Sequence, residues 1–176
     1  FRVSASRDAE AHNAAFNRWL FGVENFSSQR WNQAEKSFRE ALELVPGHKR
    51  SLRYLDALRY EREAQKILAE AETALRREAL KAAYVLAIRI TNSIAYGDQA
   101  RAVLTSIDRI VAQRLGEART SLNSGRKARF EKILAGLAFV EPYRPEITAL
   151  RAEAGRSDAE SGDDARKKTR KRRRRR

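Results

Sequence analysis

The 176-residue chain contains neither cysteine nor methionine. Without cysteine, disulfides, thiolate zinc sites and thiol nucleophiles are excluded, and cysteine usage gives no clue to the compartment. Because the sequence begins at Phe1 and has no methionine at all, we expect it to be a processed product or an excised piece of a longer protein. The compartment stays open, with the cytoplasm favoured and membrane association as the alternative.

Long apolar runs and strand-like patterns are missing as well. The best apolar run, AAYVLAIRI at residues 82–90, is interrupted by Arg89 and is far shorter than the ~18 residues needed to span a bilayer. We therefore do not expect an integral membrane protein in the chain as given. Alternating β-branched residues are absent, and neither glycine nor proline occurs between His48 and Tyr96, so the sequence predicts an all-α fold.

Local signals separate the predicted helices. Pro46 and Gly47 stop one helix, Gly97 breaks the chain before another, and Pro142 and Pro145 bracket the start of the last. The resulting prediction is seven helices, at residues 8–27, 30–45, 49–76, 78–94, 98–123, 127–140 and 145–154.

The composition divides the chain into three parts. We predict a helical repeat domain over residues 1–154, followed by a Gly/Ser/Asp-rich stretch at 155–165 that reads as a flexible acidic linker. Residues 166–176, RKKTRKRRRRR, form the basic tail, which holds ten of the 37 Lys and Arg residues. The remainder has 27 basic against 23 acidic side chains. Most of the excess positive charge thus belongs to the tail.

The chain contains an internal repeat. SQRWNQAEKSFREALELVP aligns without a gap on SGRKARFEKILAGLAFVEP, 96 residues later. Half that interval places Ala34 on Ala82 and Phe38 on Leu86, which suggests a third, more diverged copy between the other two. Because one hairpin cannot bury its apolar face alone, such copies are expected to stack. We predict about three antiparallel hairpins closed by a last helix.

The first hairpin resembles a tetratricopeptide repeat. The residues that match the pattern of this family in type and spacing are Gly22, Trp31, Ala34, Phe38, Ala41 and Pro46. The small residues let two helices approach closely, while Trp31 and Phe38 fill the space between hairpins. At an interval of 48 the middle copy has Glu70 in place of Gly22, and 48 exceeds the family's 34, which implies longer helices. The resemblance covers about residues 1–47 and implies a solenoid that binds proteins.

In that family the first helix of each repeat lines a concave groove. The matching residues of the first repeat are large or apolar and fall on one stripe, whereas Leu20 and Phe21 are expected to face elsewhere. Such a groove suits an extended peptide or a partner helix. Alternatively, the stripe is covered by residues 1–7, by upstream chain or by a second copy in a homodimer. The predicted groove residues are Phe16, Trp19, Val23 and Phe26.

Catalytic and cofactor motifs are not found. The two histidines, His12 and His48, accompany no triad pattern, and no glycine-rich phosphate loop occurs. We therefore expect no enzyme, no cofactor and no metal site. Carboxylates alternate with Arg and Lys at helical spacing, which predicts solvated ion-pairing faces; these carboxylates include Glu61, Glu63, Glu70, Glu72 and Glu78.

The tail supports three interpretations besides that of a solubilising or targeting end. It is expected to be disordered when free, because like charges repel and nothing apolar is available to bury. It is able to clamp nucleic-acid phosphates, to lie on anionic lipid, or to flank a transmembrane helix that follows Arg176 in a longer protein. Its predicted polyanion-binding residues are Arg166, Lys167, Lys168, Arg170, Lys171, Arg172, Arg173, Arg174, Arg175 and Arg176.

Taken alone, the sequence predicts a non-catalytic adaptor that binds a protein or peptide partner in a concave groove. The alternative is a polyanion-binding protein in which the tail supplies the affinity and the repeats present it. The abundance of alanine and arginine, with little lysine, is typical of a bacterial source.

Overall fold

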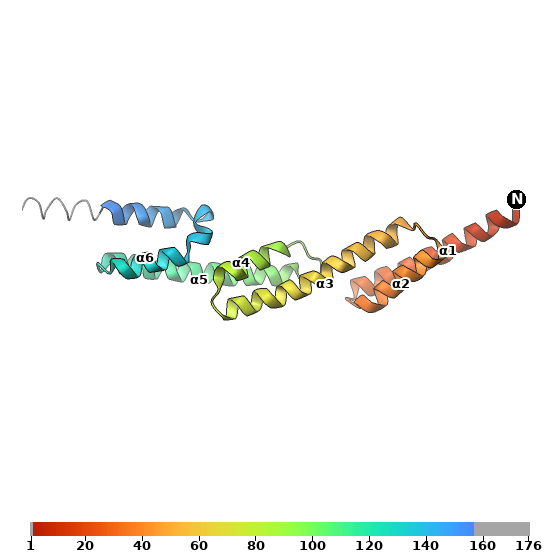
Figure 1. Ribbon diagram of the computed structural model, residues 1–176, viewed down its shortest axis with the longest axis horizontal. Coiled ribbons are helices and arrows are strands. Elements are labelled where there is room, and N and C mark those ends of the chain that lie inside the picture. The colour runs from red at the N-terminus through yellow and green to blue at the C-terminus, as the bar shows by residue number, and fades with distance from the viewer. Residues whose placement is uncertain (1, 157–176) are drawn as a thin grey trace, which may run out of the picture. The chain divides into compact units, whose positions relative to one another are not determined.

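The computed structural model describes residues 2–156, with side chains at 7–140 and 144–156, and these residues form helices but no strand (Figure 1). The all-α prediction is confirmed for this part of the chain. The predicted tail, and the predicted linker beyond its first two residues, lie outside the described residues. The elements are α1 (Arg2–Ser27), α2 (Trp31–Leu44), α3 (Lys49–Arg76), α4 (Leu80–Arg89), α5 (Gly97–Asn123), α6 (Lys127–Gly136), the 3-10 helix η1 (Ala138–Tyr143) and a last helix at 145–156.

Two predicted helices are too long. The helix expected at 78–94 ends at Arg89, where an irregular segment leads into α5, and the helix expected at 127–140 ends at Gly136 before η1. By contrast, α3 has the predicted bounds of 49 and 76. No helix among the described residues is long and apolar enough to cross a membrane.

The contacts divide the chain into two compact units, with the boundary inside α5, between Leu104 and Thr105. Unit 1 contains α1 to α4 and the start of α5, and unit 2 contains the rest of α5 and the elements after it. Each is described by itself below. The predicted single repeat domain over residues 1–154 stays a prediction.

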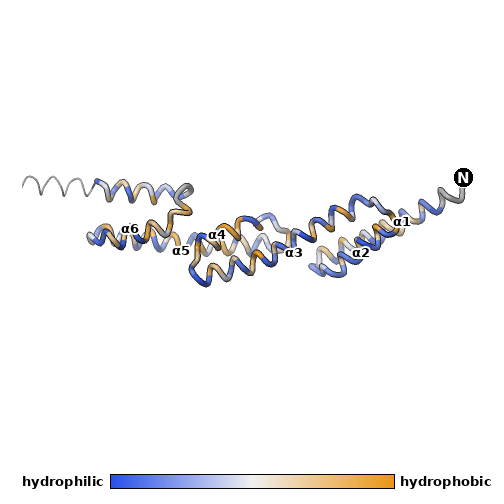
Figure 2. Tube along the Cα trace, in the orientation of Figure 1, coloured by the Kyte–Doolittle hydropathy of each residue, from blue (hydrophilic) through white to orange (hydrophobic). Residues whose placement is uncertain are grey.

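Unit 1 is built around a core shared by α1, α2 and the first half of α3. Phe26, Ala34, Phe38 and Leu58 form its buried centre. The ring of Tyr54 stacks on that of Phe38, with 5.0 Å between the ring centroids. Apolar positions recur once per turn or so along each helix, with polar positions between them (Figure 2). This period places one face of each helix in the core.

One turn geometry occurs three times within residues 2–156. Gln29, Glu78 and Gly125 all have positive φ, at 56°, 56° and 69°. In each case the amide of this residue donates to the carbonyl three residues back, and the next amide donates to the carbonyl five residues back. This is the Schellman pattern that ends a helix. The helices before these turns, α1, α3 and α5, have 26, 28 and 27 residues. The helices after them, α2, α4 and α6, have 14, 10 and 10 residues.

These turns correct the register of the middle copy. Gln29 and Gly125 are 96 residues apart, as the sequence alignment has it, but Glu78 follows Gln29 by 49 residues. At an interval of 49, Gly22 corresponds to the fully buried Ala71, and Ala34 to the fully buried Ala83. The predicted equivalents of Gly22 and Ala34, Glu70 and Ala82, are exposed. The predicted alignment of Glu70 with Gly22 was wrong, because the first two turns are 49 residues apart and not 48.

Unit 2 has its own apolar core. Ile107, Val111, Phe130 and Leu134 are at most 1% exposed. The last helix packs into this core through Ile147 and Leu150, which are 0% and 3% exposed. Arg144, just before that helix, forms an ion pair with Asp108 on α5.

Glu61 contradicts the prediction of a solvated carboxylate. Its side chain is 1% exposed and accepts hydrogen bonds from Ser93 Oγ at 2.5 Å, the Ile94 amide at 2.9 Å and the Ala95 amide at 3.2 Å. Three donors compensate a buried carboxylate for the water it loses. This arrangement accounts for the early end of α4, since the segment after it turns back onto α3 in place of continuing as a helix.

Candidate functional site

The four predicted groove residues do not line an open groove together. Phe16 is 41% exposed, Trp19 and Val23 are half-buried, and Phe26 is only 6% exposed. The Phe26 ring lies edge-on to Trp31 and Tyr54, with centroids 5.3 and 5.4 Å away. Phe26 is therefore a core residue. Tyr54 of α3 packs against Trp19 and Phe26 and so covers part of the stripe. From the sequence alone, we expected residues 1–7, upstream chain or a second copy in this place.

Trp19 lies at the junction of α1 and α3. Its ring centroid is 5.4 Å from that of Phe16, 6.2 Å from that of Tyr54 and 6.5 Å from that of His48. The Arg50 guanidinium stacks 5.0 Å above Trp19 and 5.9 Å from Phe16, which is within cation–π range. The indole Nε1 is buried without a hydrogen-bond partner, which is a costly state for a donor.

The exposed apolar residues beside this junction are Phe16, Leu20 and Phe21 on α1, together named the apolar face; Phe21 is turned about 100° around the helix from Leu20. They are 41%, 46% and 54% exposed. Phe16 and Leu20 are four residues apart and so lie one above the other on the helix. Leu20 and Phe21 point away from the core, as the sequence predicts, and they remain in contact with solvent. Of the four predicted groove residues, only Phe16 is substantially exposed, and it belongs to this apolar face.

A second surface is the α2–α3 cleft, a cavity of about 380 Å³. This volume falls in the range of about 300–1,000 Å³ typical of ligand pockets. Three leucines supply the apolar part of its lining and five charged residues the rest. The lining residues are Glu35, Arg39, Leu42, Glu43, Leu55, Leu58, Arg59 and Arg62.

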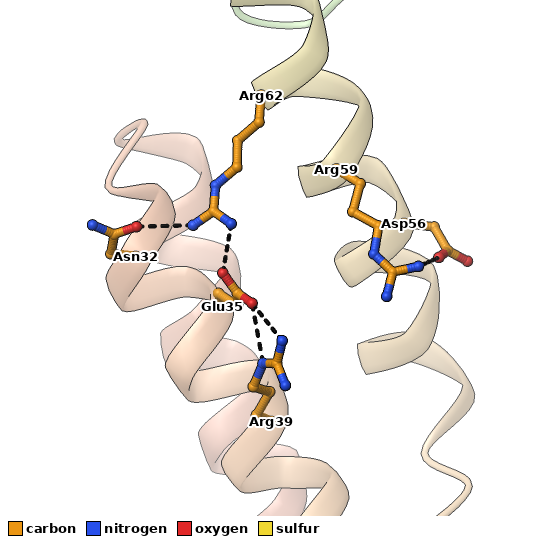
Figure 3. Close-up of polar contacts among 6 residues, drawn as sticks. All are labelled: Asn32, Glu35, Arg39, Asp56, Arg59 and Arg62. Atoms are coloured by element: carbon orange, nitrogen blue, oxygen red, sulfur yellow. Dashed lines mark hydrogen bonds and ion pairs between the residues drawn. The ribbon is translucent and has the colours of Figure 1, made fainter.

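Glu35 joins two arginines of this cleft (Figure 3). Its Oε1 accepts from Arg39 Nε at 3.1 Å and from Arg39 Nη2 at 2.6 Å, while Oε2 accepts from Arg62 Nη1 at 2.7 Å. Arg62 also donates from Nη2 to Asn32 Oδ1 at 2.8 Å. Hydrogen bonds from Arg39 first, and then from Arg62, hold the pKa of Glu35 below its ordinary value of 4.5, against the opposing effect of desolvation.

Arg59, the third arginine of the cleft, is held less firmly. Its Nη1 lies 3.5 Å from Asp56 Oδ1, and the two side chains are 79% and 76% exposed. An ion pair this exposed contributes little free energy. The guanidinium is therefore free to exchange Asp56 for another anion.

Sequence reasoning did not identify these cleft arginines. The spacing of Glu35 and Arg39, four residues apart on one helix, was a usable signal for their ion pair. The contact of Arg62 with Glu35 joins two different helices across the cleft, so no pattern within one helix predicts it.

The histidines have structural contacts. His48 caps α3 by accepting a hydrogen bond from the Ser51 amide at 3.4 Å, and its Nδ1 lies 2.8 Å from Ser51 Oγ. His12 Nδ1 lies 2.7 Å from the Asp8 carbonyl oxygen. Among the described residues no group of three or more His, Asp or Glu side chains is arranged to hold a metal ion. The ten predicted polyanion-binding residues, 166–168 and 170–176, lie outside the described part.

Comparison with known protein families, curated proteins and solved structures gives no match to this chain. The resemblance to the tetratricopeptide repeat is thus carried by the residues of the first hairpin alone.

Proposed function

We propose that this chain is a non-catalytic adaptor that binds a peptide or partner helix on a tetratricopeptide-like stack of hairpins. The partner lies on the apolar face of α1, with Trp19 at its edge. The observation that supports this proposal most directly is the exposure of Phe16, Leu20 and Phe21 within six residues of one helix. Grouped apolar side chains in solvent are typical of protein-binding surfaces.

The shape of the surface favours a helical or extended partner. Phe16 and Leu20 lie one helical turn apart on α1, so an amphipathic helix is able to lay its apolar side against them. Aromatic anchors such as Phe16 and Trp19 contribute much of the affinity in interfaces of this kind. Arg50, already stacked on both of these rings, adds a donor at the edge.

Selection of random dodecapeptides displayed on phage, with the 1–176 chain as bait, tests the proposal. We expect peptides enriched in large apolar residues at spacings of three and four. Binding of the best synthetic peptide, followed by fluorescence anisotropy, should weaken about tenfold or more in Leu20→Ser, since a central anchor contributes ~2 kcal/mol or more.

Ile88→Ser on α4 is the matched control, because Ile88 is 49% exposed and Leu20 is 46% exposed. Equal loss in both variants, or no enriched peptide, overturns the proposal. Sedimentation of the unliganded chain separates the remaining case: a dimer that Leu20→Ser dissociates means that the apolar face binds a second copy.

The alternative function is polyanion binding by the tail, favoured by ten basic residues within residues 166–176. A run of basic residues contacts phosphates without reading bases, so its affinity falls steeply with salt. Binding of residues 1–176 and 1–165 to duplex DNA, single-stranded RNA and anionic liposomes, at low and physiological salt, measures the contribution of the tail. Affinity that persists without the tail belongs to the helical body and contradicts this assignment.

A further inference from the structure

We propose that the α2–α3 cleft is a second binding site, which takes an acidic side chain flanked by apolar residues in a partner peptide. The site is separate from the apolar face of α1. It also differs from the groove that the family resemblance implies, because it lies between the second helix of one hairpin and the first helix of the next.

The charges of the cleft favour an anion. Three arginines and two glutamates line it, which leaves one positive charge in excess. Glu35 is fully engaged by Arg39 and Arg62, so it orients these guanidinium groups as well as neutralising charge. Each guanidinium carries five N–H donors, and Glu35 with Asn32 uses only some of them. Arg59 is the least constrained of the three arginines, since its ion pair with Asp56 is solvent-exposed and contributes little free energy.

The apolar lining favours a peptide over a bare ion. Leu42 on α2 and Leu55 on α3 are half-buried, so both sides of the cleft present aliphatic surface, with the buried Leu58 beneath. A free phosphate would contact only the guanidinium groups. An acidic residue next to a leucine would contact both the guanidinium groups and the leucine side chains of the cleft. A shallow cavity of about 400 Å³ adjoins the cleft along α2 and shares Glu35, Arg39 and Glu43 with it, which gives room for a peptide longer than one residue.

The hairpin itself does not require these charges. At the interval of 49 residues, Glu35 corresponds to Tyr84 and Arg39 to Ile88, so the second hairpin forms its short helix without the ion pair. Arg59 lines the cavity together with Arg39 and forms its ion pair with Asp56 on its own helix.

The test uses a six-residue peptide of alternating leucine and glutamate, its leucine–glutamine counterpart and inorganic phosphate, each titrated into the full 1–176 chain at physiological salt. Binding is followed by NMR at the Arg39, Arg59 and Arg62 Nε–H groups and at the Leu42, Leu55 and Leu58 amides. We expect saturable shifts at these positions with the glutamate peptide, and affinity about tenfold or more lower for the glutamine peptide, which lacks all three carboxylates.

Arg59→Gln should weaken the glutamate peptide about tenfold, because its exposed ion pair is not needed for folding. Arg109→Gln, which removes the same charge from an exposed position on α5, is the matched control and should leave the affinity unchanged. The basic tail attracts the peptide equally in both variants, so it cancels in their comparison. Equal effects of the two substitutions, an equal response to phosphate, or absence of shifts in the cleft overturns the proposal.

These readouts come from α2 and α3, whereas the peptide selection above depends on Leu20. Failure of one site is therefore distinguishable from failure of the other.

Discussion

Substitution of Gly22 by alanine examines a close contact between α1 and α2 in unit 1. A Cβ atom added at Gly22 would lie 2.4 Å from Phe38 Cε1 and 2.6 Å from Phe38 Cδ1. Ordinary carbon–carbon contacts are about 3.5–4.0 Å, so the ring would have to retreat by about 1 Å. Phe38 is 0% exposed and stacks on Tyr54, so no space is open behind it.

Two effects of opposite sign set the magnitude. Overpacking of a filled core costs typically 1–3 kcal/mol, and the short distance to a buried ring places Gly22→Ala near the upper end. Alanine in place of glycine within a helix contributes about 1 kcal/mol of stability. We expect a net loss of about 2 kcal/mol in the free energy of unfolding.

The two tryptophans of the chain, Trp19 and Trp31, both lie in unit 1. Urea unfolding followed by tryptophan fluorescence therefore reports on the unit that contains the substitution. Gly47→Ala in the same unit is the control, because a Cβ there meets nothing within 4 Å. It should be neutral or stabilising by up to about 1 kcal/mol.

A second substitution identifies the cause of the loss. At the interval of 96 residues, Gly22 and Phe38 correspond to Ala118 and Leu134, so the third hairpin has a larger residue where the first has glycine and a smaller one where it has phenylalanine. Gly22→Ala combined with Phe38→Leu should be less destabilised than the sum of the two single variants, by about 1 kcal/mol or more. A stable Gly22→Ala protein, or strict additivity in this cycle, would refute the close approach of α1 and α2.

Three further predictions concern other parts of the chain. Glu61→Ala should destabilise unit 1 by about 3 kcal/mol in urea unfolding, since it leaves the buried Ser93 hydroxyl and the part-buried Ile94 amide without their acceptor. Glu61→Gln keeps one oxygen and should cost less; equal costs would contradict the hydrogen-bonded role. Gly116→Ala in α5, where a Cβ meets no atom within 4 Å, should raise stability by about 1 kcal/mol in thermal circular dichroism, and a loss would show a contact at that face. The pKa of Glu35 in the folded protein is lowered from 4.5, so the stabilisation by its carboxylate is present above pH 4.5 and is lost as the pH falls through the folded pKa. The difference in melting temperature between the original chain and Glu35→Gln should therefore shrink between about pH 6 and pH 3. A constant difference would show that the ion pairs of Glu35 do not cause it.

Residues near the helix ends were predictable from the sequence, because their causes are local. Pro46 and Gly47 stop α2, and Gly125 supplies the positive φ that ends α5. The turns at Gln29 and Gly125 are 96 residues apart, as the sequence alignment predicted, because each turn also has a local cause. The middle copy has no glycine at its turn, and Glu78 adopts the positive φ instead, so its register was misplaced by one residue.

The candidate surfaces were predictable only in part. An apolar α1 was apparent from residue types, including Phe16, but the burial of Phe26 depends on Tyr54, which arrives on another helix. The cleft pairs Glu35 with Arg62, 27 residues further along the chain. Charge patterns within one helix could not reveal that contact.

By itself, then, the sequence determined the helical class, the position of most helix ends and the recurrence of one hairpin turn, since backbone propensity and hydrophobic period act over a few neighbouring residues. Only the tertiary structure decided which apolar residues of α1 face solvent, that Glu61 is buried, and that arginines from two helices line one cleft. Burial and charge pairing depend on which distant side chains meet, and a linear pattern does not contain that information.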